Sequence, residues 1–134
     1  MNLAELNYLA ILSAAITSFA IGGLWYSPTL LGKVWMREVN LTEEDAKAAN
    51  MGKIFGLAFV AALVIAFNLA AFLGPDATVT TGAFYGFLAG IGWVAMAMGI
   101  NDLFEQRSLK LYLINACYHT LTFTVMGAIL GLWH

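Results

Sequence analysis

The spacing of the charged residues is the feature that most constrains this chain. The 134 residues include six basic and eight acidic ones, and eight of these lie between Lys33 and Lys53 and four between Asp102 and Lys110. Only Glu5 and Asp76 stand outside these two groups. The uncharged intervals are long enough to cross a bilayer core of about 30 Å at about 1.5 Å per residue. Because the apolar runs are long and do not alternate, they predict membrane-spanning helices rather than the strands of a barrel.

The expected fold class is therefore all-α, an integral membrane four-helix bundle in one domain. Its spans cover residues of about 4–26, 53–73, 80–101 and 110–133 of the 1–134 chain, with connecting segments of about 27–52 and 102–109. The composition agrees, since 61% of residues are hydrophobic and 10% charged, against about 25% charged in soluble domains. The first span lacks the basic start of a secretory signal, so we expect it to be retained.

The basic residues also predict the orientation. All six lie in the first and third connections, and the second connection and both ends have none. The positive-inside rule then puts these two connections in the cytoplasm and both termini outside. A net charge of −2 gives no reason to expect a nucleic-acid partner.

Two further helices are predicted in the first connection. Residues 29–39 separate an apolar side from a polar one that carries Lys33 and Arg37, which suits a short helix lying in the membrane interface. A second helix is predicted to begin at Thr42, which can cap it and is followed by three acids. Because no proline follows before Pro75, we expect this helix to continue into the second span as a cytoplasmic extension.

Each predicted span carries small residues four positions apart, which let helix backbones approach closely. The glycines of the third and fourth spans that we expect to pack in this way are Gly82, Gly86, Gly90, Gly127 and Gly131. Such faces exceed what one compact bundle needs. We therefore expect a homo-oligomer, with a dimer as the favoured form, surrounded by membrane lipids.

Polar residues near the middle of the last span are the candidate site. Asn115 and His119 are four positions apart and share a helix face, and His119 lies roughly 15 Å inside the span. Intramembrane polar groups are costly and need partners. His119 could donate a hydrogen bond to Asn68, Thr17 or Ser18 on another helix, or it could bind a ligand or relay protons.

In the second interpretation a polar path for a ligand or for protons would be formed by His119, Asn115, Tyr118, Asn68 and Asn101. Further candidates are the charges at the cytoplasmic edge, namely Asp102, Glu105, Arg107, Lys33 and Arg37. Asp102 and Glu105, close in sequence to Arg107 and Lys110, are interpreted as a solvated charge cluster that holds the third connection in place. The alternative is a substrate or proton site at Asn101, Asp102 and Glu105. Trp25 and Tyr26 are interpreted as part of an aromatic belt at the membrane surface, or alternatively as a gate.

Motifs for catalysis are lacking. The sequence contains no nucleophile elbow, P-loop, dinucleotide fingerprint or HExxH. His119 and His134 have no cysteine or carboxylate at ligand spacing, and Cys117 is the single cysteine. We expect no enzyme activity, no metal and no cofactor.

Several short blocks resemble a bacterial family of small four-helix membrane proteins, labelled domain of unknown function 1761 (DUF1761). The blocks are Gly22–Pro28, Gly32–Trp35, Leu41–Asp45, Asn101–Glu105 with Arg107, Tyr118–His119 and Met126–Trp133. The resemblance covers nearly the whole chain and implies a bacterial inner-membrane protein with four spans. It implies no activity.

Three function classes remain open. A small transporter or channel-like protein would use the polar path, and its substrate, a small molecule or an ion, is unknown. A membrane scaffold, or a protein that binds lipids or a partner, would use the interfacial helix and the charged cytoplasmic segment. An intramembrane enzyme comes third, with no motif behind it. Transport leads because deep polar residues are costly and the connections are too small for much else.

Overall fold

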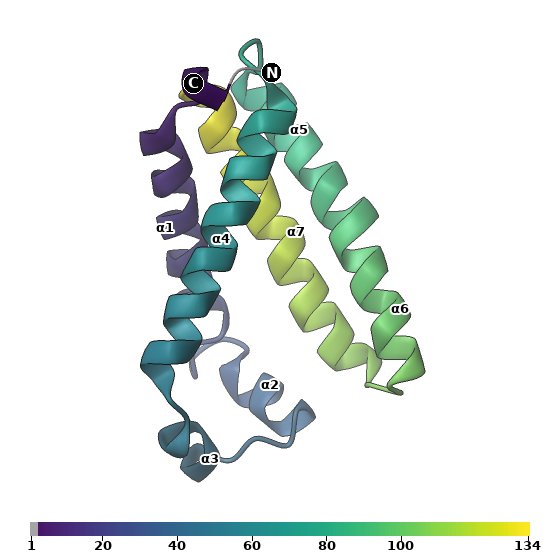
Figure 1. The fold of residues 1–134 in the computed structure, drawn as a ribbon. Helices are drawn as coiled ribbons and strands as arrows, with labels where there is room; N and C mark the ends of the chain where they lie inside the picture. Colours follow the sequence, from purple (N-terminus) through teal and green to yellow (C-terminus); the bar gives the residue numbers. More distant parts are fainter. Residues whose placement is uncertain (1–2) are drawn as a thin grey trace.

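The computed structural model describes residues 3–134, and within that range the chain is helical and contains no strand (Figure 1). The elements are η1 (Leu3–Glu5), α1 (Tyr8–Trp25), α2 (Gly32–Glu38), α3 (Glu43–Ala48), α4 (Met51–Leu73), α5 (Val79–Ala89), the π-helical η2 (Gly90–Ala95), α6 (Met96–Phe104) and α7 (Leu109–Leu132). Four helices are long and apolar enough to cross a membrane: α1, α4, the continuous helix Val79–Phe104, and α7. They cover the predicted spans, with ends shifted by a few residues.

The last helix, α7, lies at the centre of the molecule. It packs against α5 and η2 on one side and against α1 and α4 on the other, whereas α4 and α5 barely touch. In Figure 1 the pair α1 and α4 diverges from α5 and α6 toward the lower end, with α7 between them. The helices therefore surround one central member rather than forming a closed ring of four.

Small side chains allow α1, α4 and α7 to pack closely. The buried core between them consists of Ala10, Ile11, Ala14, Ala66, Leu69, Met126 and Leu130. The small residues of α1 fall four apart and face inward, as Ala10 and Ala14 are fully buried and Ser18 nearly so. Because lipid is as apolar as these side chains, the close fit itself stabilises the helix pairs.

Glycines bring α5 and α7 even closer. A Cβ built on Gly82 would collide with the carbonyl oxygen of Gly127, and a Cβ on Gly127 would collide with that of Gly82. Gly86 lies in the same way against the backbone of Phe123, and Gly131 against that of Thr78. These glycine faces are therefore used inside one chain, so they give no support to the expected contact between copies.

The helix predicted at Thr42 begins there, but it does not continue into the second span. The Thr42 hydroxyl accepts a hydrogen bond from the Asp45 amide at 3.1 Å, and the Asp45 carboxylate accepts one from the Thr42 amide at 3.2 Å. The helix then stops, because Ala49 is extended and Asn50 caps a new helix by accepting from the Lys53 amide at 3.1 Å. The prediction of one continuous helix was wrong, since asparagine favours a helix start over a helix interior.

The two ends of the molecule differ in charge. Both ends of the chain and the turn between α4 and α5 lie at one end of Figure 1, and α2, α3 and the turn between α6 and α7 lie at the other. All six lysines and arginines belong to this second end. A short helix predicted within residues 29–39 is present as α2, at the end that carries the basic residues.

Candidate functional site

Polar and aromatic side chains gather where the end of α1, the short helix α2 and the first half of α7 meet. We call this group the Tyr26 cluster. Its members are Trp25, Tyr26, Trp35, Asn115, Tyr118 and His119. Three of these residues were predicted from the sequence to lie on a polar path, and the other three come from the stretch around Pro28.

The end of α1 is fastened to α7 by two hydrogen bonds. The Tyr26 hydroxyl donates to Asn115 Oδ1 at 2.7 Å, and the Trp25 Nε1–H donates to the carbonyl oxygen of Ile114 at 3.0 Å. Tyr26 lies just beyond α1, where the backbone leaves the helix. Its burial, and then the neighbouring Tyr118, raise the pKa of the Tyr26 hydroxyl, so this group remains a hydrogen-bond donor.

Tyr118 continues the cluster toward the middle of the membrane. Its hydroxyl donates to the carbonyl oxygen of Ser18 at 3.2 Å. A Cβ on Gly22 would lie 2.9 Å from that hydroxyl, so glycine leaves the room that the ring occupies. The Tyr26 ring lies 5.1 Å from the Tyr118 ring and 5.6 Å from the Trp35 ring, both at steep angles. The rings thus connect α2 to the interior of α7.

His119 differs from the other polar members of the cluster. Its ring lies 5.0 Å from that of Tyr118, but within residues 3–134 the imidazole makes no hydrogen bond. Among the described residues, no buried side-chain nitrogen or oxygen lacks a partner. The unpaired imidazole nitrogens are therefore partly exposed, on a half-buried residue roughly 15 Å inside the last span.

The π-helical segment of the third span lies beside this position. A Cβ on Gly90, its first residue, would lie 2.8 Å from the Cα of Thr120 and 3.3 Å from the carbonyl oxygen of His119. At its other end, the Tyr112 hydroxyl donates to the carbonyl oxygen of Ala95 at 2.8 Å. A π-helical turn shifts the register of the backbone hydrogen bonds, and such turns are frequent at functional sites.

The structure brings together only part of the predicted polar path. Asn115, Tyr118 and His119 are adjacent, but Asn68 is exposed on α4 and Asn101 is exposed on α6. Neither asparagine side chain makes a hydrogen bond with the cluster. The hydroxyls of Thr17 and Ser18 donate to carbonyl oxygens of their own helix, so His119 has none of the three partners that the sequence suggested.

Within residues 3–134, the charged residues predicted at the membrane edge make no hydrogen bond with the cluster. Arg107 Nε lies 2.9 Å from Glu105 Oε2, and both side chains are exposed. Asp102 is partly exposed on α6, and Lys33 and Arg37 are exposed on α2. No group of three or more metal-ligating side chains is present in the described part of the chain. A second link joins α2 to α7, because the Ser108 hydroxyl donates to the Glu38 carboxylate.

Trp35 is the member of the cluster that sequence reasoning missed. In the predicted interfacial helix it belongs to the apolar side, whereas in the structure its ring contacts Tyr26. The available signal was the concentration of aromatic residues on either side of Pro28. An aromatic belt and a packed aromatic cluster would give the same sequence pattern. Only the position of α2 in the structure distinguishes the two interpretations.

Comparison with known proteins gives one result. The model of a protein family described as "Protein of unknown function (DUF1761)" matches residues 9–131. No curated protein and no solved structure matches this chain.

Proposed function

Since this chain belongs to the DUF1761 family, whose function is unknown, we propose an activity from its own residues: that of a small transporter or channel-like protein. It acts in the inner membrane of a bacterium, as a homo-oligomer, with both termini outside. Four apolar helices support the membrane location, and the basic residues at one end support the orientation.

One observation carries the proposal, namely the unpaired and partly exposed imidazole of His119 deep inside the last span. A polar group facing lipid at that depth is costly. The imidazole therefore faces a water-accessible path or a second copy of the chain. Asn115 lies one helical turn away on the same face, and its amide NH₂ is free of hydrogen bonds within the described residues.

The rest of the cluster holds these two groups in place. Tyr26 fixes the Asn115 amide, because its hydroxyl occupies the Oδ1 atom and leaves the NH₂ as the free donor. Tyr118 is fixed to α1 by its hydroxyl and covers one side of His119 with its ring. An amide donor and an imidazole on one helix face can bind the polar part of a small substrate or pass on a proton.

A second copy of the chain has a surface to contact on the central helix. Leu113, Cys117 and Leu121 are exposed and fall four residues apart, which forms an apolar stripe along α7. The stripe lies on the helix that carries Asn115 and His119. Residues two positions apart on a helix point about 200° apart. The stripe therefore lies on the face of α7 opposite Asn115 and His119, and a dimer formed there would leave both polar groups facing away from the contact.

Cysteine accessibility tests whether water reaches His119. Cys117 is replaced by serine, and one cysteine is then introduced as His119→Cys or, as a control, as Val64→Cys. Val64 lies near the middle of α4 and is 53% exposed. We expect a cationic, membrane-impermeant thiosulfonate to modify the cysteine at 119 and to leave the one at 64 unmodified. Equal modification of both positions, or of neither, would contradict a water-accessible path.

Transport itself is tested with protons as the probe. The purified protein is reconstituted into vesicles that contain a pH-sensitive dye, and a potassium gradient sets the potential. Proton flux that requires the protein and is lost in His119→Ala, with the oligomeric state unchanged, supports a proton path. If the wild type and His119→Ala show equal proton flux, or if neither shows any, His119 does not relay protons. Its role would then be limited to a substrate whose transport moves no protons.

A membrane scaffold that binds lipids or a partner is the second candidate. It is favoured by the apolar side chains exposed beside the basic residues, since Leu103 is 80% and Phe104 87% exposed next to Arg107. In that case replacing Lys33, Trp35 and Arg37 weakens binding to anionic vesicles, and His119→Ala changes only thermal stability. A transporter predicts instead that these three replacements leave vesicle binding unchanged, and that His119→Ala removes flux.

A further inference from the structure

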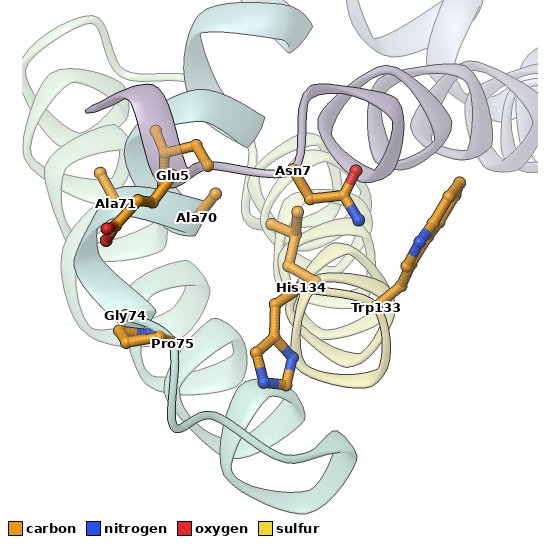
Figure 2. Close-up of a pocket in the computed structure, with 10 residues that line it drawn as sticks. Glu5, Asn7, Ala70, Ala71, Gly74, Pro75, Trp133 and His134 are labelled. Carbon is orange, nitrogen blue, oxygen red and sulfur yellow. The ribbon is translucent and has the colours of Figure 1, made fainter. Parts of the chain in front are cut away.

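A pocket lies at the end of the molecule opposite the basic residues and has a volume of about 550 Å³. It is enclosed by η1 and the start of α1, by the end of α4 with the turn that follows, and by the end of α7 (Figure 2). Its lining consists of Glu5, Leu6, Asn7, Ala70, Ala71, Gly74, Pro75, Leu130, Trp133 and His134. The pocket is separate from the Tyr26 cluster and shares no residue with it.

The lining resembles that of a small-molecule site. Most of its surface is apolar. Hydrogen-bonding groups come from the side chains of Glu5, Asn7, Trp133 and His134. Figure 2 shows Glu5 and Trp133 on opposite sides of the hollow, with Asn7 and His134 between them. Ligand sites typically enclose about 300–1,000 Å³ with mostly apolar walls and a few convergent polar groups. The size and the lining both suit one small molecule.

The charge of the pocket selects the class of that molecule. Glu5 is the one residue with a formal charge in the lining, and it makes no ion pair within residues 3–134. No lysine or arginine lies at this end, since all six belong to the opposite one. The nearby Asn7 is already engaged, because its Oδ1 accepts from the Ala10 amide at 3.1 Å. The pocket therefore offers a carboxylate without a counter-charge.

We propose that this pocket binds a small organic cation, a molecule with one ammonium group and an apolar body. The indole of Trp133 supplies the aromatic face that the ammonium group contacts, and the Glu5 carboxylate supplies the counter-charge from the opposite side of the pocket. Leu6, Ala70 and Leu130 contact the apolar body. An anion would meet the Glu5 carboxylate with no basic residue to offset it. A metal ion lacks ligands here, because Glu5 and His134 do not form a group of three.

The test is equilibrium dialysis of the protein in lipid nanodiscs with benzyltrimethylammonium as the probe. Its neutral carbon isostere, neopentylbenzene, and nanodiscs without protein are measured in parallel. We expect saturable binding of the cation at one site per chain and much weaker binding of the neutral isostere. Glu5→Gln should weaken binding about tenfold, and Trp133→Leu should weaken it several-fold.

Asp76→Asn is the matched control, because it removes an acid at the same end of the molecule that does not line the pocket. Its affinity for the cation should be unchanged, and circular dichroism should show the same helix content for all three variants. The proposal is overturned if the isostere binds equally well, if Asp76→Asn weakens binding as much as Glu5→Gln, or if the protein adds no saturable binding to the nanodisc. His119→Ala should bind the probe normally, so this test does not depend on the transporter proposal.

Discussion

The hydrogen bond from Tyr26 to Asn115 Oδ1 lets us predict how much the attachment of the end of α1 to α7 adds to the free energy of unfolding. Tyr26→Phe removes the hydroxyl and keeps the ring, so the contacts with Tyr118 at 5.1 Å and Trp35 at 5.6 Å remain. The bond is short, at 2.7 Å, and partly buried. Hydrogen bonds between membrane helices contribute about 0.6 kcal/mol on average and at most about 1.7.

We therefore expect a coupling energy in the upper part of that range, about 1–1.5 kcal/mol, for the pair Tyr26→Phe and Asn115→Ala. This corresponds to about a fivefold to tenfold change in the unfolding equilibrium. The four proteins of the double-mutant cycle are unfolded with a denaturing detergent in mixed micelles, and the loss of helix is followed by circular dichroism.

Tyr85→Phe is the control, because Tyr85 is 47% exposed on α5 and its hydroxyl makes no hydrogen bond in the described part of the chain. It should change the free energy of unfolding by less than about 0.5 kcal/mol. If the changes in the free energy of unfolding caused by Tyr26→Phe and Asn115→Ala simply add, the hydrogen bond between the two side chains contributes no stability and the prediction is refuted. The end of α1 would then be held by the Trp25–Ile114 bond and the ring contacts alone.

Three other changes follow from the packing. Gly127→Ala should destabilise the protein by about 1–3 kcal/mol in the same assay, because the new Cβ meets the Gly82 carbonyl, whereas Gly56→Ala, with open space around its Cβ, should not. Asn50→Ala should cost about 1 kcal/mol by removing the cap of α4, and Asn50→Asp should retain most of it. Mild oxidation in membranes should link two copies through Cys117 if α7 forms the dimer contact; a chain that stays monomeric on a non-reducing gel would count against that contact.

The spans could be predicted because charge is a local signal. A residue such as Lys53 or Asp102 marks the edge of the membrane wherever its helix packs, so the sequence alone places the ends within a few residues. The start of α3 could be predicted for the same reason, since Thr42 and Asp45 cap the helix by reciprocal hydrogen bonds between residues three positions apart. Asn50 shows the limit of such rules. The absence of proline was taken as continuity, although an asparagine before the second span was a sufficient reason to end one helix and begin another.

The candidate site was only partly predictable, because it depends on which helix faces which. Asn115 and His119 follow from helical spacing within one segment, and they are adjacent as expected. Asn68 and Asn101, which lie on other spans, were predicted to join the same polar path, but both are exposed. The partner of Asn115 is Tyr26, which lies 89 positions earlier in the chain, and no local pattern connects the two. The pocket at the other end escaped prediction for the same reason, since η1, α4 and α7 together form its walls.

The central position of α7 has a consequence for the order in which the chain is made. The helix that contacts the three other spans follows all of them in the chain, so it leaves the ribosome after them. Before it arrives, α1 and α4 can already pair, for example through Phe19 and Phe59, whose rings lie 5.4 Å apart. The third span has almost nothing to hold it until then, because α5 barely touches α4. A nascent chain stalled before residue 109 should therefore form cross-links between α1 and α4 but none to α5, and these helices should become one body only after α7 has been made.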